Sequence, residues 1–585
     1  MMGAEELSYQ GRSICFSIWE LLFTIKEKSK MSTNFVVPAF SHPPQGWHAI
    51  DWYAVQRQVR GLQVRIAKAT REKHWRKVKS LQRMLTRSFT AKALAVRRVT
   101  ENRGKKTPGV DGELWGTPDL KWQAITRLQR LGYRPKPLRR VYIPKSNGKR
   151  RPLGIPTMLD RAMQALYLLA LEPISETLAD RNSYGFRPVR ATADAIEQCF
   201  INLSRKNSAE WILEGDIKGC FDNISHDWLL ANIPLDKQVL RRWLKAGYME
   251  SGGLHATKAG TPQGGIISPV LANMALDGLE EVLEAHFGKK NTKASYKTKV
   301  NYVRYADDFI ITGISKGLLE YEVKPLVEAF MAERGLTLSP EKTIISHVEE
   351  GFDFLGQNVR KYRGKLLIKP SRKNLRNLLQ KVKDIISGHK TVPAKALIQM
   401  LNPVLRGWAN YHRHIVAKET FNYVDYRVWK MLWKWCRRRH ANRRKRWVKS
   451  KYFKSYGTRN WVFSGDGVGN TTHRLVYCMD TPIKRHIKIK GEANPFDPLF
   501  EEYFEKRLER HWRETMQGQK KVLILWFRQQ KCCPICRFPI TKETGWDVHH
   551  IVERVNGGSD ELNNLVMLHP NCHRQLHSIN RDNLN

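Results

Sequence analysis

The chain has 585 residues and carries 101 lysines and arginines against 55 aspartates and glutamates, a formal charge of +46. This length exceeds what one hydrophobic core supports, so several domains are expected. Such an excess of positive charge repels itself unless a polyanion is near, which favours nucleic acid as a partner. The longest apolar stretches, residues 21–25 and 522–527, are too short to cross a bilayer, so no membrane partner is expected.

The amino terminus lacks the pattern of a secretory signal, because Glu5, Glu6 and Glu20 surround its apolar residues. We therefore expect a cytoplasmic protein, associated with the nucleoid when it engages DNA. Met31 is a second plausible start, and residues 1–30 are interpreted as a possible upstream extension. Four of the nine cysteines fall in the last 54 residues and the others are scattered singly, which favours metal binding over disulfides.

Apolar residues recur at helical intervals among many cations from residue 52 to 98, and a solvated amphipathic helix is the simplest interpretation. Short apolar runs broken by Gly and Pro then alternate with helical segments to about residue 365, an α+β pattern. Apolar positions from Leu375 to Ile386 follow a 3.6-residue period, and Gly388 predicts a helix end. Further helices over 401–435 predict a small all-helical domain.

Residues 434–454 carry eleven lysines or arginines and no acid. A solvated charge run is the usual interpretation of such a segment. Aromatic residues among the cations, such as Trp435 and Trp447, favour nucleic-acid binding instead, because base stacking and phosphate neutralisation use this mixture.

Two β-prone runs meet at the pair Asp307-Asp308, within residues 302–311. A hairpin is expected there, with both carboxylates at its tip, although an Asp-Asp pair alone often only makes a polar turn. A second apolar strand, residues 211–217, carries Asp216 into an otherwise buried element, where acids are seldom structural unless paired or metal-bound. Three such carboxylates on neighbouring strands predict a site for two Mg²⁺ ions, as used in phosphoryl transfer.

Seven segments occur in the order of reverse transcriptase sequence blocks. They are 140–155 (RVYIPKSNGKRRPLGI), 183–188 (SYGFRP), 214–223 (EGDIKGCFDN), 261–269 (TPQGGIISP), 305–308 (YADD), 335–343 (GLTLSPEKT) and 352–356 (FDFLG). Together they resemble the protein encoded by a mobile group II intron. The resemblance implies a multidomain α+β protein whose polymerase has the right-hand arrangement, with a mixed α/β palm and an all-helical thumb.

The resemblance also implies roles for single residues. Asp216 and Asp307 would be the principal Mg²⁺ ligands, completed by Asp308. Phe221 matches the aromatic position that excludes a 2′-hydroxyl, although an ordinary core Phe is the alternative. Gln263 would line the pocket of the incoming dNTP.

Lys145 and Arg151 match basic positions that meet the triphosphate of the dNTP. The flanking Lys149 and Arg150 are alternatives for this pair.

Residues 401–413 (LNPVLRGWANYHR) resemble the thumb, or maturase, segment of the same family, although aromatic packing is a simpler role for Trp408 and Tyr411. The family then implies a binding site for intron RNA and, at the basic stretch, one for target DNA. The expected domains are an RNA-binding extension (31–90), fingers and palm (91–365), helical thumb (366–430), basic DNA-binding region (431–495), and linker helix with nuclease (496–585).

Near the carboxy terminus, two ligand pairs have the spacing of a closed tetrahedral Zn²⁺ site: Cys533 with Cys536, and His569 with Cys572. Such a structural metal would stabilise a domain too small to rely on its core. Cys532 is an alternative to Cys533, with poorer spacing.

The same segment resembles an HNH endonuclease with its ββα-metal fold. His573 and His577 lie one helical turn apart and, with His549, would bind one divalent ion, which we expect to be Mg²⁺. His550 would be the general base that activates water. Asn564 would hold the loop and orient His550.

The sequence therefore predicts a multifunctional enzyme that binds its intron RNA, assists splicing, nicks DNA and extends the new 3′ end by copying RNA. One alternative is a splicing-only RNA-binding protein with decayed enzymatic sites, which the intact Asp216, Asp307, Asp308, His550 and His573 disfavour. A retron or defence-system reverse transcriptase is another, which the maturase-like thumb and the HNH module disfavour. The sequence leaves the oligomeric state open.

Overall fold

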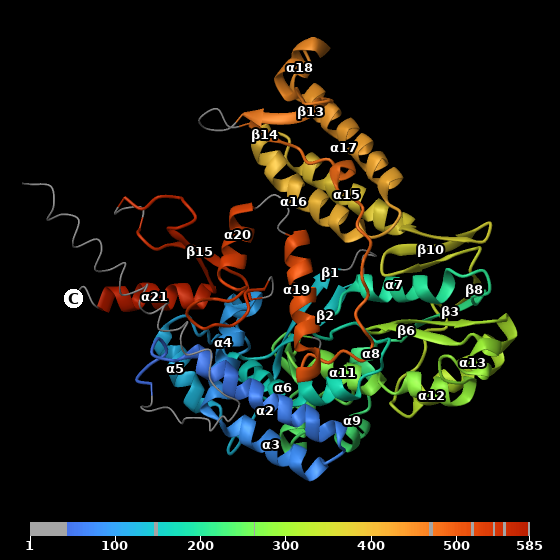
Figure 1. Ribbon diagram of the computed structural model, residues 1–585, viewed down its shortest axis with the longest axis vertical. Coiled ribbons are helices and arrows are strands. Elements are labelled where there is room, and N and C mark those ends of the chain that lie inside the picture. Colours follow the sequence, from blue (N-terminus) through green and yellow to red (C-terminus); the bar gives the residue numbers. More distant parts are fainter. Residues whose placement is uncertain are drawn as a thin grey trace, which may run out of the picture. The chain divides into compact units, whose positions relative to one another are not determined.

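The computed structural model describes residues 44–144, 150–261, 264–466, 472–515, 520–541, 544–553 and 557–582. The chain divides into two compact units, whose helices and strands carry the labels of Figure 1. Unit 1 comprises Met1–Leu178, Phe221–Met274 and Ala493–Asn585, and unit 2 comprises Ala179–Cys220 and Ala275–Glu492. The chain therefore passes from one unit to the other several times, and neither unit is one continuous segment. The expected extension at residues 1–30 lies outside the described residues.

Unit 1 begins with helices and a small sheet, and it ends with the carboxy-terminal module. Its helices are α2 (Trp52–Arg71), α3 (Trp75–Arg87), α4 (Phe89–Glu101), α5 (Pro118–Arg127), α6 (Met158–Leu178), α8 (Cys220–Asn223), α9 (His226–Asn232), α10 (Lys237–Leu244), α11 (Ser268–Leu276), α19 (Glu501–Thr515), α20 (Lys520–Arg528) and α21 (Pro570–Asp582). Its strands are β1 (Leu138–Pro144), β2 (Arg150–Ile155), β4 (Tyr248–Glu250), β5 (Gly253–His255), β15 (Asp547–His550) and β16 (Leu565–Leu568).

The amino-terminal helices of unit 1 pack around α6. The periodic apolar residues of α2 are buried, and Val55, Val59 and Ile66 are each at most 1 % exposed. Asp51 caps α2 by accepting hydrogen bonds from two backbone N–H groups. Both α2 and α4 contact α6, whose own residues are buried on most sides. The interpretation of this region as a solvated helix therefore holds only for its cationic face, because its apolar stripe forms core.

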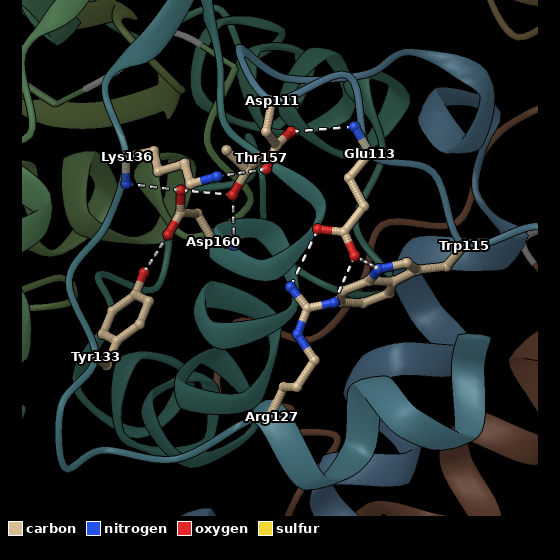
Figure 2. A network of polar contacts seen from close by, with 8 residues as sticks. All are labelled: Asp111, Glu113, Trp115, Arg127, Tyr133, Lys136, Thr157 and Asp160. Atoms are coloured by element: carbon tan, nitrogen blue, oxygen red, sulfur yellow. Dashed lines mark hydrogen bonds and ion pairs between the residues drawn. The ribbon is translucent and has the colours of Figure 1, made fainter. Parts of the chain in front are cut away.

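A buried polar network fixes the segment that leads into β1 (Figure 2). The carboxylate of Asp160 accepts hydrogen bonds from the Tyr133 hydroxyl (2.7 Å), the Thr157 hydroxyl (2.7 Å) and the backbone N–H of Lys136 (3.2 Å). Beside it, Glu113 accepts from the Trp115 indole N–H at 2.8 Å and pairs with Arg127. Asp160, which is 3 % exposed, and the half-buried Glu113 thus each accept from several donors, as polar groups in or near a core usually do.

Unit 2 contains the larger sheet and most of the remaining helices. Its helices are α7 (Thr192–Leu203), α12 (Leu279–Phe287), α13 (Lys293–Thr298), α14 (Lys324–Ala332), α15 (Arg372–Gly388), α16 (Ala394–His412), α17 (Lys418–Arg439) and α18 (Lys445–Tyr452). Its strands are β3 (Trp211–Asp216), β6 (Asn301–Tyr305), β7 (Asp308–Gly313), β8 (Ile344–His347), β9 (Phe352–Phe354), β10 (Gln357–Tyr362), β11 (Lys365–Pro370), β12 (Phe453–Tyr456), β13 (Arg459–Asp466) and β14 (Thr472–Arg474).

The larger sheet of unit 2 has the strand order β6-β7-β3-β8, and its strand pairs are antiparallel. The hairpin expected at residues 302–311 is confirmed as β6 and β7, and the strand expected at 211–217 is confirmed as β3. The hairpin tip differs slightly from the expectation, because Ala306 and Asp307 form the turn while Asp308 already pairs with Tyr305 as the first residue of β7.

Three helices, α15, α16 and α17, pack together in unit 2, and α15 ends at Gly388 as predicted (Figure 1). A three-stranded sheet, β12-β13-β14, follows them, although the sequence indicated only a basic region there. The boundaries expected at 90/91, 365/366 and 430/431 fall inside α4, β11 and α17. Changes in charge along a chain do not end a helix, since exposed cations are compatible with helical structure. Among the described residues, no helix has both the length and the apolar character needed to cross a bilayer.

Replacing Asp160 with alanine should destabilise unit 1. Asp160→Ala leaves three donors without their acceptor, and each stranded buried group costs about 1–3 kcal/mol. We expect a clearly lower melting temperature by circular dichroism. The matched control is Asp119→Ala, which removes an exposed acid from the first turn of α5 and should cost only about 0.5 kcal/mol. Equal melting temperatures for the two variants would contradict the proposed importance of the network.

Candidate polymerase and nuclease sites

The pairing of β3 with β7 brings the candidate carboxylates together within unit 2. In this register Asp216 lies directly opposite Asp308. Asp307 occupies the adjacent turn of the β6–β7 hairpin. The register is fixed from the interior: Ile212 and Leu213 of β3 are fully buried, and a Cβ on Gly215 would lie 2.1 Å from the Phe309 ring. All three acids predicted from the sequence therefore gather at one end of the sheet.

The three carboxylates form a concentration of negative charge. Desolvation, together with the neighbouring carboxylates of Asp307 and Asp216, raises the pKa of Asp308 to about 6. Protonation or a cation relieves such repulsion, and oxygen ligands of this kind suit Mg²⁺. The donor set therefore fits a divalent metal site.

Lys342 is a residue of this site that the sequence analysis did not single out. Its ammonium lies 2.8 Å from a carboxylate oxygen of Asp216, and this hydrogen bond raises the pKa of Lys342. Backbone contacts hold its segment at the end of β3, since the N–H of Ser339 donates to the carbonyl of Asp216 at 2.8 Å. The only sequence signal was the position of Lys342 inside the 335–343 segment, which was matched as a block without a role for this side chain.

The candidate nucleotide-pocket residues are only partly described. Lys145 and Gln263 lie outside the described residues, as does the alternative Lys149. Arg151 is exposed on β2, opposite Ile143 of β1. Phe221 is half-buried in α8, where its carbonyl accepts a 2.6 Å hydrogen bond from the N–H of Thr261. Arg151 and Phe221 belong to unit 1, whereas the three carboxylates belong to unit 2.

The aromatic residues of the 401–413 segment take part in packing within unit 2. The indole N–H of Trp408 donates to Asn374 at 2.6 Å, and the Tyr411 hydroxyl donates to the carbonyl of Leu355 at 2.8 Å. The simpler role considered for both residues, packing within the helical region, accounts for these contacts.

In the basic stretch 434–454 the cations are exposed while most of the aromatic residues are not. Trp435, Tyr452 and Phe453 are between 4 and 6 % exposed, and Trp447 is half-buried. Exposed cations lie over the rings, as where Nζ of Lys451 is 4.8 Å from the ring centre of Trp447. This surface therefore offers charge for phosphates rather than free rings for base stacking.

Four buried side chains of the carboxy-terminal module converge on one point. The ligand atoms of Cys533, Cys536, His569 and Cys572 all lie within 4.8 Å of one another. The Nε2 atom of His569 lies 3.3 Å from the carbonyl of Pro539, an arrangement that leaves Nδ1, 3.2 Å from the sulfur of Cys536, for a metal. Three thiols and one imidazole in this arrangement fit a closed tetrahedral metal site.

A second group, His549, His573 and His577, also has its ligand atoms within 4.8 Å of one another. Burial and the neighbouring imidazoles lower the pKa of His549 to about 4, so its ring is neutral at pH 7 and has a lone pair for a metal. Asp547, which the sequence analysis did not select, lies with a carboxylate oxygen 3.3 Å from Nδ1 of His573. Such a carboxylate orients the ring so that Nε2 faces the other two histidines.

His550 and Asn564 lie on either side of one loop. Nε2 of His550 is 2.7 Å from a carboxylate oxygen of Asp560, another residue that the sequence analysis did not select. The amide of Asn564 donates to the carbonyls of Val552 (3.0 Å) and Ser559 (2.8 Å) and accepts from the N–H of Val552 (2.7 Å). Asn564 thus holds both ends of the loop that follows β15.

Four family models match the chain. They are the N-terminal domain of reverse transcriptase at residues 47–128, reverse transcriptase (RNA-dependent DNA polymerase) at 143–359, the group II intron maturase-specific domain at 375–453, and HNH endonuclease at 533–578. The first three models cover the amino-terminal helices, the sheet with the carboxylates and the α15–α18 helices. The fourth covers both clusters of candidate metal ligands.

Relatives of known sequence agree with these matches. Protein YkfC of Escherichia coli is 36 % identical over 317 residues, which span 47 % of this chain and 81 % of that protein. The group II intron-encoded protein LtrA of Lactococcus lactis is 28 % identical over 553 residues, covering 78 % of this chain and 87 % of LtrA. A solved telomerase of Candida albicans aligns with a TM-score of 0.32 at 12 % identity, over 54 % of this chain and 65 % of that one, too weak a likeness to carry an argument.

Removing one thiol of the four-residue cluster should empty its metal site. Cys536→Ala leaves three ligands where a closed site needs four, so the zinc expected at this site should fall from about one equivalent to near zero. Elemental analysis of the purified protein measures this directly. The control is Cys199→Ala, which removes a buried thiol of α7 and should leave the metal content unchanged. Unchanged metal in Cys536→Ala would rule out this ligand set.

Proposed function

This chain belongs to the group II intron-encoded proteins that join reverse transcriptase, maturase and HNH endonuclease domains, and from that premise we propose how its residues carry out each activity. The protein is a multifunctional group II intron protein, and its maturase and reverse transcriptase domains imply binding of intron RNA. In our proposal it assists the splicing of that RNA, nicks one strand of a DNA target and extends the new 3′ end with dNTPs, using the RNA as template.

The observation that carries the polymerase proposal is the placing of Asp216 opposite Asp308, with Asp307 on the adjoining turn. These three carboxylates would hold two Mg²⁺ ions, which when bound lower the pKa of the primer 3′-hydroxyl and offset the charge of the pyrophosphate. The ammonium of Lys342 pairs with the carboxylate of Asp216 and so reduces the repulsion among the three acids before substrate binds.

The remaining polymerase roles rest on sequence resemblance. Lys145 and Arg151 would bind the triphosphate through charge-assisted hydrogen bonds. Gln263 would line the nucleotide pocket, and Phe221 would exclude a ribose 2′-hydroxyl.

In the nuclease, His549, His573 and His577 would hold one divalent ion, which we propose is Mg²⁺ and which when bound stabilises charge on the scissile phosphate and leaving oxygen. His550 would take the proton from the attacking water, since a neutral imidazole is a base at physiological pH. Asp560 stabilises the resulting imidazolium through its 2.7 Å contact.

Zn²⁺ is the proposed ion for the four-ligand cluster. The cluster offers three thiolates and one imidazole, and all four side chains are buried. Soft sulfur ligands in a closed set of four suit Zn²⁺ and leave no position for a substrate. The role of this site would be structural: it fixes the start of α21, which carries His573 and His577.

The exposed cations of residues 434–454 support a DNA-binding role for this region. Their charges would neutralise phosphates without reading bases, which makes binding strongly dependent on salt. We propose that this region holds the target duplex, while the amino-terminal helices and the α15–α17 helices hold intron RNA.

Loss of one carboxylate should abolish DNA synthesis. Asp307→Ala removes a proposed metal ligand, and metal stabilisation worth several kcal/mol corresponds to a loss of about a thousandfold or more in rate. Primer extension on an RNA template with Mg²⁺ measures this, and RNA binding by the same preparation confirms that the variant is folded. A folded, RNA-binding parent that makes no product would favour a splicing-only protein.

Loss of the proposed base should abolish nicking alone. His550→Ala should slow nicking of target DNA by about a hundred- to ten-thousandfold, the usual contribution of general base catalysis. It should still extend a primer, whereas Asp307→Ala should nick and fail to extend, so each variant controls for the other. Nicking at full rate by His550→Ala would assign the base to another residue.

A further inference from the structure

The turn that carries Asp307 has a backbone conformation that must be held from outside. Ala306 has a φ of 59°, in the left-handed region that is unfavourable for residues other than glycine. Ala306 is also only 7 % exposed, so water does not support the turn. Because Asp307 follows directly and Asp308 begins β7, any change at Ala306 would move two of the three carboxylates.

The side chain of Arg304 supports this turn from the interior. Arg304 precedes the turn on β6 and is 0 % exposed. One guanidinium nitrogen donates to the carbonyl of Ala306 at 3.3 Å, and another pairs with the carboxylate of Asp277, between α11 and α12. Burying a guanidinium is costly unless it is paired and hydrogen-bonded. This pair therefore links the turn to a separate part of unit 2.

The 183–188 segment supports the same turn through its backbone. The N–H of Tyr184 donates to the carbonyl of Arg304, and the N–H of Arg304 donates to the carbonyl of Asn182, both at 2.9 Å. Gly185 lies so close that a Cβ there would be 2.2 Å from the backbone nitrogen of Ala306. That distance is far below van der Waals contact, and the obstructing atoms belong to the backbone. Any side chain at position 185 would clash with the backbone of the turn, so this position requires glycine.

The 183–188 segment is itself anchored to the α11–α12 region. The guanidinium of Arg187 donates to the carbonyls of Asp180 (2.7 Å) and Ser183 (2.8 Å). The carboxylate of Asp180 accepts from the N–H of Gly278, at 2.9 Å. Gly278, which binds Asp180, and Asp277, which pairs with Arg304, are neighbours in the connection between α11 and α12. Both sets of contacts that support the turn therefore end on this one connection.

We propose that Arg304, Asp277 and Gly185 form a turn cradle, a set of positioning residues that fixes Asp307 and Asp308 in the geometry needed to hold metal. The proposal rests on the polymerase function proposed above. None of the three residues needs to touch substrate. The cradle assigns a role to the 183–188 segment, which was matched as a sequence block without a function.

Gly185→Ala is the sharpest test, because it adds one methyl group and changes no charge. We expect a fall in kcat for primer extension of about a hundredfold, the effect of misplacing catalytic groups by about 1 Å. The Mg²⁺ concentration for half-maximal rate should rise, while the affinity for intron RNA stays within about threefold of the parent, since RNA binding does not depend directly on the turn. The matched control is Gly317→Ala. A Cβ at position 317 would lie 3.9 Å from its nearest neighbour, a side-chain atom of Tyr321, and the φ of Gly317 is −61°.

Arg304→Lys tests the cradle by a different change. Lysine keeps the buried charge, but its single ammonium replaces the forked donor that reaches both Ala306 and Asp277. We expect the same pattern: lower kcat, a higher Mg²⁺ requirement and unchanged RNA binding. The control is Arg334→Lys, at a buried arginine that donates to the carbonyls of Ala275 (2.8 Å) and Phe330 (2.7 Å) and to the carboxylate of Glu333 (2.9 Å). It should lower the melting temperature comparably and leave the Mg²⁺ requirement unchanged.

The outcomes separate this proposal from the polymerase proposal. If the parent does not extend a primer, the polymerase proposal fails and the cradle fails with it. If the parent extends and Gly185→Ala is as active as Gly317→Ala, the cradle alone is overturned. The same holds if Arg304→Lys and Arg334→Lys lose activity equally with an unchanged Mg²⁺ requirement, which would indicate general loss of stability. Insoluble Gly185→Ala protein leaves Arg304→Lys, with RNA binding as its folding check, to decide the question.

Discussion

The antiparallel pairing of β3 with β7 is the constraint on which the polymerase site depends. Side chains alternate between the two faces of a strand, so a slip of one residue would send Asp216 to the opposite face from Asp308. The register is held by the buried residues Ile212 and Leu213 and by the close approach of Gly215 to Phe309. Hydrophobic packing inside the sheet thus fixes a cluster of charges at its end, where the carboxylates repel one another.

The candidate metal sites of the polymerase and of the carboxy-terminal module differ in how the protein supports them. The polymerase carboxylates stand on a sheet with a large core, and the surrounding structure holds even the unfavourable backbone of Ala306. Among its described residues, the carboxy-terminal module has one sheet, the two-stranded β15-β16, with α21 beside it. A sheet this small has little stability of its own. In our proposal a metal held by the four-ligand cluster would supply the missing support and place α21, which carries two of the three histidines of the second cluster.

The sequence analysis identified residues with a strong chemical signal and overlooked those that work through geometry. Asp216, Asp307 and Asp308 stood out as acids within apolar strands, and the spacing of Cys533, Cys536, His569 and Cys572 indicated one ligand set, which the structure brings together. Lys342, Asp547 and Asp560 were missed because single charged residues in loops or at strand ends are common. Their importance comes from contacts across 10 to 126 positions of sequence. The aromatic residues of 434–454 suggested rings available for base stacking, yet most of them are buried. Composition cannot distinguish a buried ring from an exposed one.

The sequence by itself determined the order of the strands and helices around the carboxylates, the family and the identity of most candidate ligands. These follow from local patterns: apolar periodicity, glycine at helix ends and ligand spacing within a few residues. The tertiary structure alone decided which residues support those ligands, such as Arg304 beneath the turn, and that the three-stranded sheet β12-β13-β14 follows the helices. Such facts depend on contacts between distant segments and on steric limits of a few tenths of an ångström. A linear pattern carries no record of either, because many sequences with the same pattern would bring different side chains to the same place.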